Sequence, residues 1–258
     1  MINGKSFFNS FIAGIRTLQL RYIILFATIT TPSVSQHQAG GDVPNPNFSI
    51  TPRFNSAGHF PFSGALLNNN FNFDVNIYFE YKKNGFFIFK SIDLEDKHSF
   101  VNYLQPGIFR KFQLSPKFKI GTFFGYVFNQ TYEWRDKDSD YFTAAVAYWT
   151  INDRLKLENT SLFFDLSQSV KLANRFLLNY KVKKFQFDVY VWHRIVFDSN
   201  SHATSASLAI NFPRIRLTDK VAIQNTVSYQ GYLTHTKPDF AMRKGLLVSI
   251  AFPITISK

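Results

Sequence analysis

Charged and polar side chains recur at alternate positions in three consecutive segments of the chain, a spacing that places them on one face of a β-strand. In these rows bases outnumber acids. A row of fixed positive charge can bind or select anions, whereas mixed charges can pair with one another and only stiffen the protein. The rows are Arg154, Lys156 and Glu158, then Lys171, Arg175, Asn179 and Lys181, then Lys184, Gln186, Asp188, Tyr190, Trp192 and Arg194.

The turns between these segments predict which charges meet. A tight turn at Val182-Lys183 would set Arg175 opposite Tyr190, with Asp188 as a diagonal neighbour. A four-residue loop at 165–168 would set Glu158 opposite Arg175. We therefore expect a cluster of Glu158, Arg175 and Asp188 within a net-positive wall, and its charges serve either an anionic solute or one another.

A second polar row lies on an earlier segment, Phe71 to Tyr81. Its odd positions are all apolar or aromatic, and its even positions include Asp74, Asn76 and Glu80. Strict alternation over this length predicts a β-strand with two chemically different faces. The three polar residues form either an acidic wall across from the basic one or ordinary solvated positions.

Most later segments repeat this alternation, and shorter turns tend to alternate with longer, more polar loops. Residues 114–117, 151–154 and 217–220 each place Ser, Asn or Thr before a base, so we expect side-chain hydrogen bonds to pin these turns. The alternation slips at Pro106-Gly107, where we expect a β-bulge. The pattern predicts an all-β fold, a transmembrane antiparallel up-and-down β-barrel of about twelve strands, with ten and fourteen as bounds.

Alternation alone does not say which row faces outward. Strands of about 9 to 13 residues match tilted membrane strands, and about twelve strands enclose more space than side chains readily fill. A secretory signal points the same way. We therefore expect lipid against two apolar rows: Phe118, Ile120, Phe124, Tyr126 and Phe128, and Phe185, Phe187, Val189, Val191, Ile195 and Phe197.

The N-terminus has the parts of a secretory signal. Bases precede a short apolar stretch from Tyr22 to Ile29, and the small residues Ser33-Val34-Ser35 follow. That stretch is too short to cross a bilayer as a helix. We expect a signal peptide at 1–35, a flexible lead-in at 36–45 and the barrel at 46–258.

The alternating segments 71–81, 118–128, 185–197 and 246–256 resemble those of Gram-negative outer-membrane β-barrel proteins of the small porin-like type. The resemblance is architectural. It implies a location in the cell outer membrane, in contact with outer-membrane lipid. We expect a monomer, and the basic rows predict small anionic solutes as partners. Such proteins usually end in a terminal aromatic residue, and this chain departs from that pattern with Ile256-Ser257-Lys258.

Other functions find little support in the residues. The net charge is +12, but no long run of bases indicates a nucleic-acid partner. No clustered metal ligands or phosphate loop stand out, so we expect no metal, no cofactor and no catalytic residue. An outer-membrane lipid hydrolase would need a base beside its serine. None of the six histidines has serine two positions later: His37, His59, His98, His193, His202 and His235.

The sequence thus predicts a passive channel or solute-binding pore with a modest anion preference. The alternative is a closed structural or partner-binding barrel without transport, followed by the hydrolase and a soluble ligand-binding barrel. Small residues at Gly121, Gly125, Ala145, Ala147, Ser205 and Ser207 are expected on inward rows, where they leave room for a pathway or a packed segment.

Overall fold

The computed structural model describes residues 46–57, 59–60, 65–66, 70–94, 102–130, 139–167, 170–198, 201–236 and 244–257. The expected signal peptide and lead-in, 1–35 and 36–45, lie outside the described residues. No helix within the described ranges is long and apolar enough to span a membrane.

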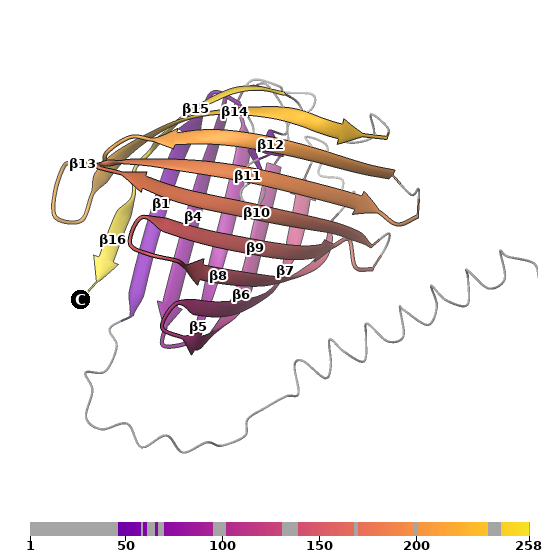
Figure 1. The fold of residues 1–258 in the computed structure, drawn as a ribbon, viewed down its shortest axis with the longest axis horizontal. Coiled ribbons are helices and arrows are strands. Elements are labelled where there is room, and N and C mark those ends of the chain that lie inside the picture. Colours follow the sequence, from indigo (N-terminus) through magenta and orange to yellow (C-terminus); the bar gives the residue numbers. More distant parts are fainter. Residues whose placement is uncertain are drawn as a thin grey trace, which may run out of the picture. The chain divides into compact units, whose positions relative to one another are not determined.

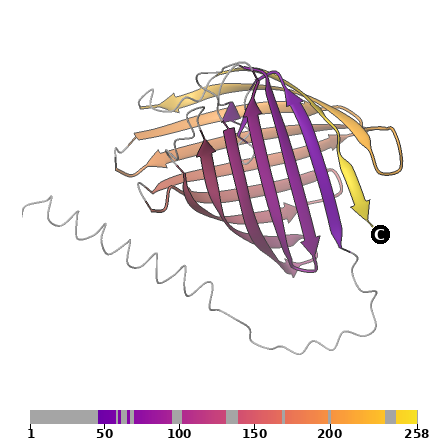
Figure 2. The ribbon, with the colours of Figure 1, turned by 180° about the vertical axis from the view of Figure 1, so that it is seen from behind.

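Twelve antiparallel strands close into a barrel, which confirms the predicted fold class and strand number. Each barrel strand pairs with the next in sequence, and β1 pairs with both β4 and β15 to close the ring. Figure 1 shows β8 to β12 crossing one side of the barrel, and Figure 2 shows the early strands on the other side. The barrel strands are β1 (Asn47–Asn55), β4 (Asn72–Tyr81), β5 (Asn84–Asp93), β6 (Asn102–Ser115), β7 (Phe118–Gln130), β8 (Asp140–Thr150), β9 (Leu155–Phe164), β10 (Lys171–Val182), β11 (Phe185–Val196), β12 (Ser201–Asn211), β14 (Ala222–His235) and β15 (Gly245–Ala251).

Four short strands complete the sheets. β2 (His59–Phe60) and β3 (Ala65–Leu66) form a separate hairpin, and β13 (Ile215–Arg216) pairs with β14. The last predicted strand is interrupted, because Phe252 and Pro253 separate β15 from β16 (Ile254–Ser257). Proline has no N–H to donate to the ladder, which accounts for the break. β16 continues the closure by pairing with β1.

The two faces of each strand differ in burial as well as in chemistry. On β4, Asp74 is 1% exposed, whereas Phe71 just before the strand is 58% exposed. Further around the barrel the exposed large side chains are also apolar, including Ile108, Leu208, Leu233 and Leu246. The barrel therefore presents an apolar outer surface and buries its polar rows within.

Lysine pairs form two of the tight turns, and one of these turns differs from the sequence prediction. The β4–β5 turn consists of Lys82-Lys83, and the β10–β11 turn consists of Lys183-Lys184. Lys82 and Lys183 have φ values of 56° and 54°, which are uncommon for residues other than glycine. The predicted Val182-Lys183 turn is wrong by one residue, because Val182 pairs with Phe185.

The other predicted turn devices are present. Ser115 Oγ accepts a hydrogen bond from the Lys117 N–H, and Asn152 Oδ1 accepts from the Arg154 N–H. Thr218 Oγ1 does the same for Lys220. The expected bulge at Pro106-Gly107 is wrong, because β5 and β6 stay in one register through both residues. The irregularity instead lies between Gln113 and Ser115, next to the turn into β7.

Candidate functional site

The basic wall forms on three adjacent strands, β9, β10 and β11. Eight predicted residues lie on its inward rows, where they alternate with outward apolar side chains. Arg154 and Lys184 lie instead in the turns before β9 and β11, at the end of the wall. The inward eight are Lys156, Glu158, Lys171, Arg175, Lys181, Asp188, Tyr190 and Arg194.

Glu158 and Arg175 form an ion pair within this wall. Their register differs from the predicted one, because Arg175 lies opposite Thr160 and Trp192, and Glu158 lies opposite Leu177. The pair is therefore diagonal, and the long side chains span the offset. Arg175 also donates to Thr160 Oγ1 at 3.2 Å. Its Nε is buried without a hydrogen-bond acceptor among the described residues.

Asp188 does not join this pair, which corrects the predicted three-residue cluster. Its carboxylate accepts from Asn179 Nδ2 at 2.7 Å, Gln186 Nε2 at 2.8 Å and Asn211 Nδ2 at 2.7 Å. The donors come from β10, β11 and β12. Neutral amides stabilise the carboxylate without cancelling its charge, so Asp188 places one acid deep in the basic wall.

Near the longer loops, the wall combines bases with an aromatic ring. Lys171 pairs with Asp165. The Arg194 guanidinium lies 4.9 Å from the Phe164 ring centroid, within cation–π distance. Lys171 is thus neutralised by an acid.

The polar row of β4 lies inside the barrel, and its two acids are each bonded to a base. Asp74 accepts from Arg53 Nε at 3.0 Å and from Asn55 Nδ2 at 2.6 Å. Asn55 in turn accepts from Ser249 on β15 at 2.7 Å. This network joins β4 to the first and last strands of the barrel, where the ring closes.

Glu80 accepts a hydrogen bond from Lys111 Nζ at 2.8 Å and one from the Tyr78 hydroxyl at 2.7 Å. Tyr78 stacks on Phe109 with ring centroids 5.0 Å apart. Asn76 lies half-buried in the same row, opposite Phe89 and Thr51. Since Asp74 and Glu80 are both paired, this row supplies little net negative field.

Sequence reasoning missed an aromatic inner surface on β5 to β8. Phe87 and Phe142 lie with ring centroids 6.3 Å apart, although β6 and β7 separate their strands. They reach one another over inward glycines: a Cβ on Gly107 would lie 2.5 Å from the Phe87 ring, and one on Gly125 would lie 2.6 Å from the Phe142 ring. Aromatic rings therefore fill the space that the glycines leave, which was predicted to be a pathway or the site of a packed segment.

This surface is part of a buried apolar cluster with members on every strand from β5 to β12. Ala145 is exposed on the outer face, and its neighbours Ala144 and Val146 are the buried inward residues, which corrects the predicted row of β8. The signal that was available in the sequence is the placement of Phe at consecutive positions, such as 86–87 and 123–124, beside inward glycines. The cluster is Phe87, Phe109, Phe123, Phe142, Ala144, Val146, Leu162, Ala173, Trp192 and Ala203.

Side chains from well-separated strands also interact across the interior. Tyr190 on β11 interacts electrostatically with Arg53 on β1, with β12, β14 and β15 between them. Tyr148 on β8 interacts in the same way with Glu80 on β4. Polar groups from β1, β4, β8 and β11 thus face the interior at this level.

Several solved structures have a fold similar to that of this barrel. A KdgM porin is 8% identical with a TM-score of 0.56, and the match covers 81% of this chain and 99% of that one. The barrel has the fold of outer-membrane channels. A NanC porin matches at 8% identity and a TM-score of 0.54 over 81% of this chain and 100% of that one. An outer-membrane channel from Pseudomonas putida F1 matches at 9% identity and a TM-score of 0.55, over 84% of this chain and 99% of that one.

These likenesses bear out the porin-like resemblance inferred from the alternating strands. No family model matches the chain. No curated protein matches it in sequence either. At this level of identity the solved structures establish the fold and leave the solute to be argued from the residues.

Proposed function

We propose that this chain is an outer-membrane barrel that acts as a passive channel or solute-binding pore with a modest preference for anions. The observation that carries the proposal is the inward row of β9 to β11, where bases outnumber acids. Glu158 neutralises Arg175 there, and Asp165 neutralises Lys171. Lys156 and Lys181 form no ion pair among the described residues and remain as bases against Asp188, so the row stays net positive.

The fold supports the membrane location, as does the apolar outer surface. The chain contains no cysteine, so Val75→Cys and Asn76→Cys each give one labelling site on β4. A spin label at 75 should be reached by oxygen dissolved in lipid, and a label at 76 by a water-soluble nickel reagent, because the two side chains face opposite sides of the strand. The reverse accessibility of the two labels would indicate a soluble barrel.

Anion preference is tested by removing two inner bases. At about 6 Å in a water-like medium, one unit charge changes the energy of a passing ion by about 0.7 kcal/mol, or roughly threefold in occupancy. Lys156→Gln with Lys181→Gln should therefore lower the chloride-to-potassium permeability ratio by roughly threefold or more. The measurement is the reversal potential across a planar bilayer under a salt gradient.

The matched control removes two bases outside the lumen, Lys82 in a turn and Arg110 on the outer row of β6. Lys82→Gln with Arg110→Gln should leave the permeability ratio near that of the parent protein. Equal ratios in all three proteins would refute selection by the inner row. A complete absence of channels in the parent protein would refute transport itself.

A closed structural barrel is the second candidate, and the buried apolar cluster favours it. Phe142 is 1% exposed and Trp192 is 5% exposed, although both point inward. A barrel filled in this way needs no wet pathway and conducts poorly. The parent protein's conductance separates the two functions.

A further inference from the structure

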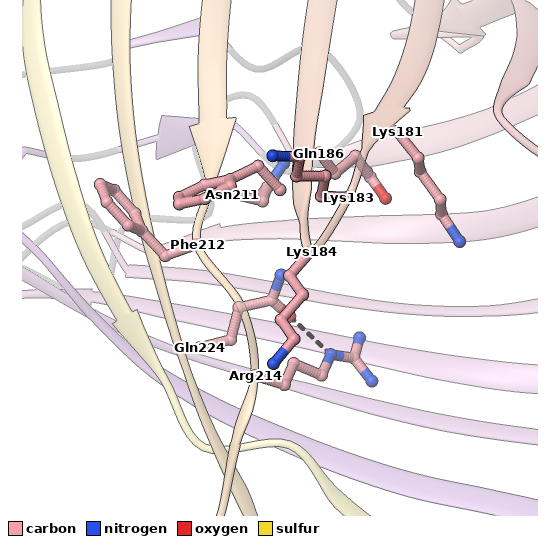
Figure 3. Close-up of a pocket in the computed structure, with 9 residues that line it drawn as sticks. Lys181, Lys183, Lys184, Gln186, Asn211, Phe212, Arg214 and Gln224 are labelled. Carbon is pink, nitrogen blue, oxygen red and sulfur yellow. Dashed lines mark hydrogen bonds between the residues drawn. The ribbon is translucent and has the colours of Figure 1, made fainter.

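A pocket of about 430 Å³ opens at the tight-turn end of the barrel. It lies between the β10–β11 turn, the segment that follows β12, and the start of β14. Figure 3 shows Lys184 and Arg214 extending into the same space beside Gln224. The pocket thus joins the inner mouth of the basic wall to the rim of the barrel.

All charged side chains that line the pocket are bases: Lys181, Lys183, Lys184 and Arg214. None of the four forms an ion pair within the part of the chain that the structure describes. The nearest inward acid on β11 is Asp188, two positions beyond the lining residue Gln186. Three amides already occupy its carboxylate. Asp188 keeps its single negative charge behind the lining residues Gln186 and Asn211, and the four bases exceed it, so the pocket stays net positive.

One polar side chain of the pocket holds its arginine in place. Arg214 donates from Nε to Gln224 Oε1 at 2.9 Å, which fixes the guanidinium and leaves its terminal nitrogens as donors. Asn211 is held between Asp188 and Thr226. A fixed guanidinium beside lysines suits the oxygens of a phosphate group, which accept several charge-assisted hydrogen bonds at once.

The outer edge of the pocket is aromatic. Phe185 and Phe212 lie with ring centroids 5.9 Å apart in an edge-to-face arrangement, and both are substantially exposed. A ligand held here would place its charged group on the bases and a less polar portion against the rings. The other tight turns are basic as well, at Lys82-Lys83, Lys117 and Arg154, so their field draws anions toward this rim.

We propose that this pocket binds a phosphate ester at the tight-turn mouth of the barrel. The group arrives either on a free solute or on the head of an anionic phospholipid, and both present the same oxygens to Lys184 and Arg214. This site goes beyond the proposed channel, because equilibrium binding at the mouth requires no passage through the barrel.

The experiment measures binding to the full-length barrel in an uncharged detergent. Glycerol 3-phosphate is the soluble probe, measured by isothermal titration calorimetry, with glycerol as the uncharged control. Phosphatidylglycerol against phosphatidylcholine, followed by native mass spectrometry, tests the lipid source. Lys184→Gln with Arg214→Gln removes two bases from the pocket, and Lys82→Gln with Lys83→Gln removes two from another turn at the same end.

The pocket variant should bind at least about tenfold more weakly, because each lost donor was bonded to a charged group. The control should stay within about twofold of the parent protein, since it removes the same charge outside the pocket. Loss with glycerol 3-phosphate alone identifies a solute site, and loss with phosphatidylglycerol alone identifies a lipid site. Loss with both supports the shared chemistry.

Equal binding by the pocket variant and the control would overturn the site, as would the absence of phosphate-dependent binding by the parent protein. This outcome differs from failure of the channel. A barrel that binds glycerol 3-phosphate but passes no current would support the binding site and contradict transport. The opposite result would support transport alone.

Discussion

Replacing Arg175 with alanine should lower the free energy of unfolding by about 3 kcal/mol. The guanidinium is almost fully buried, and its ion pair with Glu158 bridges β9 and β10. Without it, Glu158 keeps a charge in an interior where little water can replace the lost partner, and Thr160 loses a hydrogen-bond donor. Urea unfolding in lipid vesicles, followed by tryptophan fluorescence, measures the change, and one of the three tryptophans, Trp192, lies directly opposite Arg175.

Two further variants distinguish the contribution of this ion pair to stability from that of its surroundings. Lys171→Ala breaks the more exposed pair with Asp165 and should cost no more than about 1 kcal/mol. Glu158→Gln with Arg175→Gln removes both charges together, and should recover part of the stability that Arg175→Ala loses. An Arg175→Ala barrel as stable as Lys171→Ala would show that the inner pair is no more important than a rim pair.

The strands and their two faces could be predicted because apolar and polar residues alternate along each strand. Residues 71–81 differ by one position from β4, and the outward apolar residues of β7 and β11 follow the same period. Register could not be predicted in this way. A slip of two residues keeps every side chain on its own face and changes only its partner. That is why Arg175 was predicted opposite Glu158 and lies opposite Thr160.

The sequence predicted which residues of the candidate site face inward, but it did not predict which of them contact one another. Its inward residues follow from the period of β9 to β11, but the three amides around Asp188 depend on the register of three strands at once. The pocket at the tight-turn end needs the turn after β10 to begin at Lys183 and the chain after β12 to bring Arg214 beside Gln224. Neither arrangement corresponds to a periodic pattern in the sequence.

The aromatic interior was not predicted for a different reason. Phe side chains can be placed against lipid only on strands where one row is apolar and the other is polar. On β5 and β7 both rows contain Phe, so alternation does not separate them. The inward rings are tolerated because Gly107 and Gly125 remove the side chains they would meet. Packing of this kind is decided by pairs of neighbouring strands, which a single strand does not encode.

Replacing Phe142 with alanine should have two effects that test this interior together. Phe142 is 1% exposed and is packed against Phe87 over the Gly125 backbone. Loss of such a ring from a packed cluster costs about 3 kcal/mol or more, through lost contacts and the cavity that remains. The same cavity would widen the barrel interior, so single-channel conductance should rise. Urea unfolding in vesicles and planar-bilayer recording measure the two effects on one protein.

Phe124→Ala is the matched control on the adjacent strand, because this ring is 41% exposed on the outer surface. It should cost less than Phe142→Ala, about 2 kcal/mol, because unfolding moves this ring from lipid to water but the substitution leaves no internal cavity, and it should leave conductance unchanged. A Phe142→Ala barrel that loses stability and gains conductance would identify the aromatic cluster as the constriction of a channel. Loss of stability with no current in either protein would favour the closed barrel, because a cavity on one side of a filled interior opens no path. Unchanged stability would contradict the packing itself.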